Sequence, residues 1–93
     1  MVVGIVRVEL HLPGAQSLKD KRQVVRSIKE RIRERVHASV AEVEYQDLWQ
    51  RTAIGIAVVG SDGGQVREML QSARHIVDTY LQAQVLDWQE NLQ

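Results

Sequence analysis

Residues 17–36, SLKDKRQVVRSIKERIRERV, decide the fold, because this helical pattern separates strand patterns on either side of it. Ser17 stands three residues before Asp20, a variant of the capping box found where helices begin. Apolar residues then recur at helical spacing. These residues are Leu18, Val24, Val25, Ile28, Ile32 and Val36. The pattern predicts a helix that begins at Ser17 and ends near Arg35.

Strand patterns lie on both sides of this helix. In residues 2–12, apolar and mixed positions alternate, as in a strand with one buried face, and PGAQ then interrupts the pattern. Residues 37–46 and 50–60 are two alternating, β-branched runs joined by a short connection, which predicts a hairpin. Glu42 and Glu44 are two residues apart, so we expect them to share a face of an edge strand. The second run is nearly uncharged, as in a central strand.

A second helix and a last strand follow the hairpin. Ser61 or Asp62 can cap the helix, whose apolar residues again recur at helical spacing. The apolar seam consists of Val66, Met69, Leu70, Ala73, Ile76, Val77, Tyr80 and Leu81. Residues 84–92 alternate once more and predict an edge strand. Its apolar positions are Leu86, Trp88 and Leu92.

The order strand, helix, strand, strand, helix, strand predicts an α+β fold. Each strand, helix, strand unit forms a right-handed crossover, and interleaving two such units around the hairpin gives a ferredoxin-like βαββαβ sandwich. We therefore predict a four-stranded antiparallel sheet of order 4-1-3-2 with both helices on one face. Residues 1–93 are expected to form a single domain, since a chain of 93 residues is too short for a second core.

The composition is that of a soluble protein, with 44% hydrophobic and 26% charged residues. The absence of cysteine excludes disulfides and cysteine zinc sites, and it favours an intracellular, cytoplasmic location. The first residues, MVVGIVRVELHL, are interrupted by Arg7 and Glu9. They match neither a signal peptide nor a membrane span.

No motif for catalysis stands out in the sequence. The serines lie in no nucleophile elbow or triad-like context, and the three histidines, His11, His37 and His75, lack the spacing of metal ligands. GSDGG precedes the second helix but lacks the lysine of a phosphate-binding loop, so a turn and a cap explain it better. We expect no enzyme activity, no metal site and no cofactor.

Positive charge is concentrated in the first helix. The whole chain has a formal net charge of +0, yet residues 17–36 contain eight basic and three acidic residues, a net charge of +5. Five of the cations form a basic stripe along one flank of the apolar seam, four of them at i, i+4, i+7 and i+11. The basic stripe is Lys19, Arg22, Arg26, Lys29 and Arg33.

The basic stripe predicts contact with successive phosphates of a nucleic acid. A solvent-exposed helix face without any ligand explains the same residues. Cations near the C-terminal end of a helix are stabilised there by the negative end of the helix dipole. Lys21 falls near the apolar seam instead, and we expect its long side chain to reach solvent past the end of the sheet; a buried ligand role at that edge is the alternative.

The sheet face opposite the helices offers a second candidate surface. RNA-recognition motifs stack bases on aromatic residues of such a face, but Phe is absent here and the first strand presents none there. If Ile54, Ile56 and Val58 point to the helices, the other face of their strand carries Arg51 and small residues. Such a flat, apolar face is typical of self-association, so a homodimer through this face or an edge strand is the alternative function. The reverse orientation of the strand remains open.

Two strings of sequence resemble the YlxP-like family of small bacterial proteins, a family of unknown function. They are SLKDKRQVVRSIKERI and SVAEVEYQDLWQRTAIGIAVVGSD, and the likeness covers nearly the whole chain. The resemblance implies a ferredoxin-like fold. It also implies an RNA or ribosomal partner, because genes of the family often lie among those for transcription and translation factors. It implies no catalytic residue.

The second of these strings draws attention to the predicted hairpin tip. Asp47, Trp49 and Arg51 form a candidate protein interface there, since tryptophan is enriched in the residues that dominate binding energy. An equally good interpretation is that Trp49 folds back over one end of the core.

Overall fold

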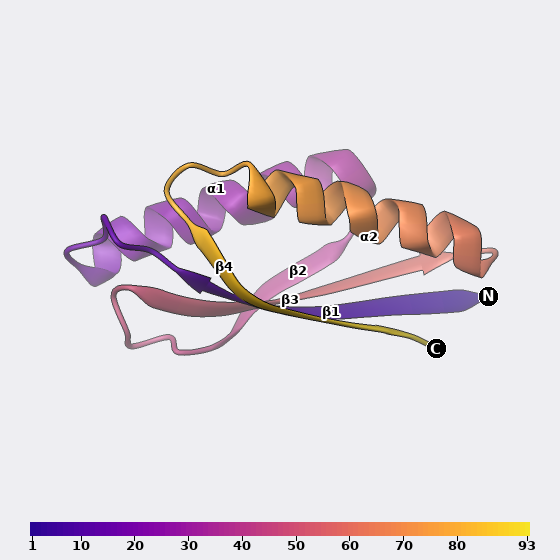
Figure 1. Cartoon of the computed structure of the whole chain (residues 1–93), viewed down its shortest axis with the longest axis horizontal. Helices are drawn as coiled ribbons and strands as arrows, with labels where there is room; N and C mark the ends of the chain where they lie inside the picture. The colour runs from indigo at the N-terminus through magenta and orange to yellow at the C-terminus, as the bar shows by residue number, and fades with distance from the viewer.

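Two helices lie on one face of a four-stranded sheet in the computed structural model, which describes residues 1–93 (Figure 1). The elements are β1 (Val2–His11), α1 (Leu18–Val36), β2 (Ser39–Glu44), β3 (Arg51–Gly60), α2 (Gly63–Asp78) and β4 (Gln84–Leu92). All strand pairs are antiparallel. No helix has the length and apolar character needed to cross a membrane.

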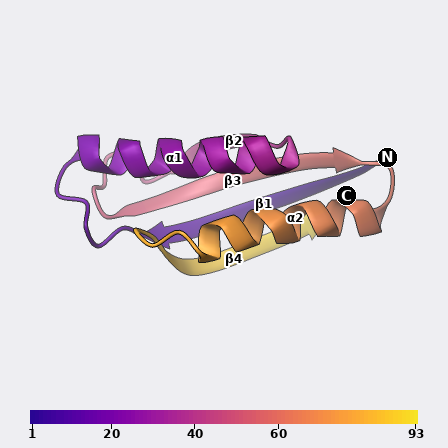
Figure 2. The ribbon, with the colours of Figure 1, turned by 90° about the horizontal axis from the view of Figure 1, so that it is seen from above.

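The strand order is β2-β3-β1-β4, which is the predicted order read from the other edge. The ferredoxin-like prediction is therefore confirmed, with β1 and β3 at the centre. Seen from above, α1 lies over the β2–β3 side of the sheet and α2 over the β1–β4 side (Figure 2). The opposite side of the sheet carries no helix, and we call it the uncovered face.

Both helices begin at the residues that the sequence indicates. The Ser17 side chain accepts a hydrogen bond from the backbone N–H of Asp20 at 3.0 Å, so the predicted cap of α1 is confirmed. Of the two candidates for α2, Asp62 is the cap, and it accepts from the N–H of Gln65 at 2.9 Å. α1 ends at Val36 and is capped by His37, whose φ of 50° lies in the left-handed region.

The core lies between the helices and one face of the sheet. Ile54, Ile56 and Val58 point to the helices, which resolves the orientation of β3 that the sequence left open. Their partners across the β1–β3 pair are Val8, Val6 and Gly4. The helices contribute the apolar residues Val25, Ile28, Ile32, Val36, Val66, Leu70, Ala73 and Val77.

Two apolar residues that continue the predicted helical and strand patterns are exposed. α2 ends at Asp78, and the chain turns back between Tyr80 and Ala83, so Leu81 leaves the helical seam and is 100% exposed. In β4, a register shift opposite Glu9 and Leu10 breaks the alternation, which leaves Leu86 exposed while Trp88 faces the helices. Both expectations were wrong because a turn and a bulge interrupt otherwise regular patterns.

Candidate functional site

Lys21 connects α1 to the β2–β3 hairpin through a buried ammonium. The residue is 1% exposed, and Nζ lies 3.0 Å from the Glu42 carboxylate. Nζ also lies within hydrogen-bond distance of three backbone carbonyls at the turn of the hairpin. These belong to Tyr45 at 2.6 Å, Gln46 at 3.1 Å and Arg51 at 3.3 Å. The expectation that Lys21 reaches solvent was wrong, because the turn supplies enough acceptors to hold the charge inside.

The two carboxylates of β2 lie on opposite faces of the sheet. A register shift between Glu42 and Glu44 inserts Val43 as an extra residue, so the expected shared face was wrong. Glu42 faces the helices, where it pairs with Lys21 and accepts from Thr52 Oγ1 at 2.5 Å. Glu44 lies on the uncovered face and pairs with an arginine of β1.

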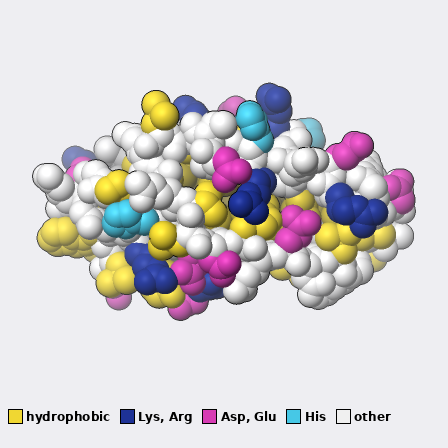
Figure 3. Space-filling view, viewed as in Figure 1, with side chains coloured by type: hydrophobic (Ala, Val, Ile, Leu, Met, Phe, Trp, Pro, Cys, Tyr) yellow, Lys and Arg dark blue, Asp and Glu magenta, His cyan; other side chains and the backbone are white.

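An ion cluster, consisting of Arg7, Glu9, Glu44 and Arg51, covers one end of the uncovered face. Glu9 accepts from Arg7 Nη1 at 2.8 Å and from Arg51 Nη2 at 2.6 Å, while Arg7 also pairs with Glu44. The Arg51 guanidinium lies 4.8 Å from the centre of the Tyr45 ring. Figure 3 shows basic and acidic side chains side by side along the lower edge of the molecule, where this face lies in the same view.

The ion cluster makes stability depend on pH. Hydrogen bonds from Arg51 and then Arg7 lower the pKa of Glu9 to about 2, from an ordinary value of 4.5. The stabilisation is therefore fully present above pH 4.5 and is lost as the pH falls toward 2. We expect Glu9→Gln to melt below the wild type at pH 7, with the difference shrinking through this window. Melting temperatures across that range test this, with exposed Glu30→Gln as the control; a constant difference would contradict it.

The basic stripe runs along the flank of α1 that faces the β2 edge of the sheet. Arg33 marks this flank, because its Nη2 donates to the backbone carbonyl of Val40 at 2.7 Å. Lys19, Arg22 and Arg26 are exposed, and Lys29 is partly buried. None of the ion pairs in the structure includes a residue of the basic stripe. The five charges therefore have no acidic partner within the chain.

The hairpin tip presents Trp49 to solvent. Trp49 is 54% exposed, which excludes the alternative that it folds over the core. Together with Asp47 and Arg51 it lines a hollow of about 510 Å³, and His11 borders the same hollow. The tip is tied to the end of β1 through Gln50, whose carbonyl accepts from Leu12 N–H at 2.9 Å. The structure thus brings the three predicted tip residues together, although Arg51 is also engaged by Glu9.

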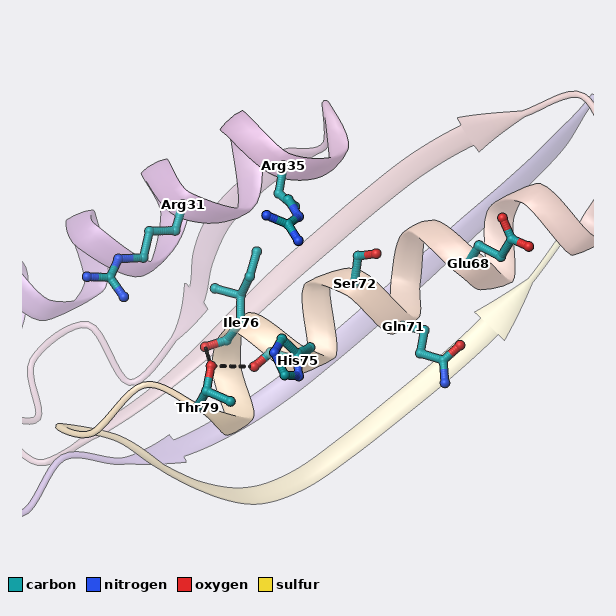
Figure 4. Close-up of a pocket in the computed structure, with 8 residues that line it drawn as sticks. All are labelled: Arg31, Arg35, Glu68, Gln71, Ser72, His75, Ile76 and Thr79. Carbon is teal, nitrogen blue, oxygen red and sulfur yellow. Dashed lines mark hydrogen bonds between the residues drawn. The ribbon is translucent and has the colours of Figure 1, made fainter.

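The sequence pattern did not predict a groove that lies between α1 and α2. It encloses about 610 Å³ and receives Arg31 and Arg35 from α1, opposite Ser72 and His75 of α2 (Figure 4). Arg31 and Arg35 are four residues apart and so share the flank opposite the basic stripe. That i, i+4 spacing was a detectable signal, but it acquires meaning only when α2 is placed beside it.

The three histidines lie apart. His11 borders the tip, His37 caps α1 and His75 lies in the groove. No three side chains of the His, Asp or Glu type gather as a group that could hold a metal ion. The basic stripe and the groove carry arginine and lysine side chains, which bind phosphate and carboxylate groups.

Comparison with known proteins identifies relatives without an assigned role. Residues 3–90 match a family described as "Protein of unknown function (DUF503)". The "Uncharacterized protein YlxP" of Bacillus subtilis (strain 168) is 37% identical over 85% of this chain and 86% of its own. Two designed proteins share the fold. "De novo designed protein Foldit4" has a TM-score of 0.52 at 14% identity, with 97% of this chain and 94% of that one covered. "De novo designed protein Ferredog-Diesel" has a TM-score of 0.50 at 11% identity, and the match covers 96% of this chain and 83% of that one.

Proposed function

Since the chain belongs to this YlxP-like family of unknown function, its role has to be inferred from its own residues, and we propose that it is a nonenzymatic RNA-binding protein that uses the basic stripe. The observation that carries the proposal is that five cations on one flank of α1 have no acidic partner in the chain. Unpaired cations in a row are what a phosphate backbone neutralises.

The geometry of the basic stripe supports contact with a strand of phosphates. Lys19 and Arg33 are separated by about 21 Å along the helix, at 1.5 Å per residue. Asp20 and Glu34 lie away from the basic stripe, whereas Glu30, one turn after Arg26, lies on its outer border. The uncovered face offers no aromatic platform on β1 or β3, so recognition through phosphates rather than bases fits the surface. The gene neighbourhood implied by the resemblance favours RNA as the partner, and ribosomal RNA in particular.

The direct test is RNA affinity of a charge-reversed stripe. We expect Arg22→Glu with Arg26→Glu to weaken binding at least tenfold, and the wild-type affinity to fall steeply with added salt. Fluorescence anisotropy of a labelled RNA measures both. The matched control is Arg31→Glu with Arg35→Glu, which changes net charge equally on the other flank. Equal losses in the two variants would show that overall charge alone acts, and wild type that binds no RNA would refute the proposal.

The ribosomal part of the proposal needs a separate experiment. Wild-type protein should recover ribosomal components from a cell lysate at low salt, but not at high salt or after nuclease treatment. The charge-reversed stripe should recover none. Recovery of the protein alone under all conditions would contradict a ribosomal partner while leaving RNA binding in vitro to be judged separately.

A second candidate function is self-association through the uncovered face. Ile5, Val43 and Val59 are exposed there, between 40% and 60%, around the small residue Gly55. Exposed branched residues on a sheet face that carries no helix fit a second copy of the chain. We expect a dimer in solution by light scattering, converted to monomer by Val43→Glu and unaffected by the charge-reversed stripe. A monomeric wild type would exclude this candidate.

The hairpin tip completes the proposed contacts. Trp49, with Asp47 and Arg51 beside it, would bind a protein partner, because a solvent-exposed tryptophan on a tethered turn is a typical anchor of an interface. The partner is testable through Trp49→Ala, which should abolish a pull-down interaction while leaving the melting temperature unchanged.

A further inference from the structure

The groove between α1 and α2 is the second place where cations lack partners. Arg31 and Arg35 line it from α1, and none of the ion pairs in the structure includes either residue. Its volume of about 610 Å³ falls in the range of small-molecule sites, roughly 300–1,000 Å³. The groove lies on the opposite flank of α1 from the basic stripe, so it is a separate surface.

Packing holds one of the two arginines in place. The Arg31 guanidinium lies over the Tyr80 ring, 4.9 Å from the ring centre, and Tyr80 itself is buried. Stacking of this kind fixes the plane of the guanidinium while leaving its N–H groups available at the rim. A guanidinium already ordered loses less conformational entropy when it binds an anion.

The wall formed by α2 is polar except for Ile76, which points toward α1 between the two arginines (Figure 4). Figure 4 shows Ser72 on the side of α2 that faces α1, across from Arg35, with Glu68 one turn further along the helix. His75 lies one turn in the other direction. Hydroxyl and imidazole groups can donate to an anion, whereas the Glu68 carboxylate repels a phosphate and accepts from a hydroxyl group. The groove thus has a cationic end and a hydroxyl-accepting end.

We propose that this groove binds a small phosphate monoester that carries sugar hydroxyls. Arg35 contacts the phosphate as a bidentate donor, and Ser72 donates to one of its oxygens. The Arg31 side chain extends away from Arg35 (Figure 4), so it supplies a second positive charge from the Tyr80 end of the groove. Glu68 accepts from a hydroxyl of the sugar. The size of the groove admits a sugar phosphate or a nucleoside monophosphate, and inorganic phosphate would occupy the cationic end alone.

Titrations of the full chain, followed by two-dimensional NMR, test the proposal with inorganic phosphate, ribose 5-phosphate and adenosine monophosphate. We expect saturable shifts at Ser72 and His75, and tighter binding of the two monoesters than of phosphate. Arg31→Gln with Arg35→Gln should weaken all three at least tenfold. Glu68→Gln should weaken the monoesters but not phosphate, which separates recognition of the sugar from that of the anion.

The matched control is Arg22→Gln with Arg26→Gln, which removes two charges from the same helix on the other flank. It should retain the affinity for ribose 5-phosphate, whereas RNA binding should fall in this control and persist in the groove variant. The two proposals can therefore fail independently. Equal loss of ribose 5-phosphate affinity in both double variants, or no saturable binding of any compound at millimolar concentration, would overturn the groove site.

Discussion

Lys21→Met is expected to lower the free energy of unfolding by about 3–5 kcal/mol, because it removes one partner of a buried ion pair and leaves the other uncompensated. Glu42 would lose its cation, and the carbonyls of Tyr45, Gln46 and Arg51 would lose their shared donor. Chemical denaturation measures the loss directly. The melting temperature should fall by roughly 12 °C or more.

Two further variants make the Lys21 result specific. Lys19→Met removes the same charge from an exposed position two residues away, and it should change stability by less than about 0.5 kcal/mol. Adding Glu42→Gln to Lys21→Met should cost less than the sum of the single changes, since no buried carboxylate remains unpaired. A loss at Lys21 no larger than that at Lys19 would contradict the buried ion pair.

The position of Lys21 also bears on the hairpin tip. Its acceptors flank residues 47–50, so the ammonium fixes the turn that presents Trp49. Tyr45 has a φ of 65°, a left-handed conformation that costs energy in a residue other than glycine. The hydrogen bond from Nζ to its carbonyl helps to hold that conformation. The tip is therefore tethered to the fold by the Lys21 ammonium as well as by the carbonyl of Gln50.

The fold was predictable because its signals are local. Alternation in β1 and β3, helical spacing in α1 and the caps at Ser17 and Asp62 all agree with one topology. The errors arose where one residue changes the register. Val43 is apolar in an alternating strand, so nothing in the sequence marks it as a bulge. Leu81 continues a helical spacing although the helix has already ended.

The candidate sites were predictable only where one element forms them. The basic stripe belongs to α1 alone, so a helical wheel finds its flank. The surroundings of Lys21 come from carbonyls 24 to 30 residues away, and the groove requires α2 beside α1. Such contacts depend on tertiary packing, which residue spacing does not encode.

Packing of α2 against β1 depends on a glycine near the start of this central strand. Gly4 faces the helices, opposite Val58. A Cβ atom placed there would lie 2.5 Å from Val66 Cγ1 and 2.9 Å from Leu70 Cδ1, well inside van der Waals contact. Both neighbours are fully buried and cannot move into empty space. The absence of a side chain at Gly4 therefore sets how closely α2 approaches the sheet.

Gly4→Val should accordingly lower the free energy of unfolding by about 3 kcal/mol, and Gly4→Ala by about 1–2 kcal/mol, because each added carbon overpacks a dense core. Denaturant titration measures both losses. Gly14→Val is the control, since a Cβ at Gly14 meets no atom within 4 Å and its φ is not positive, so its effect should stay within about 0.5 kcal/mol. If the two valine variants were equally stable, α2 could not pack directly on Gly4. A loss confined to Gly4 is the result expected if α2 packs directly on this residue.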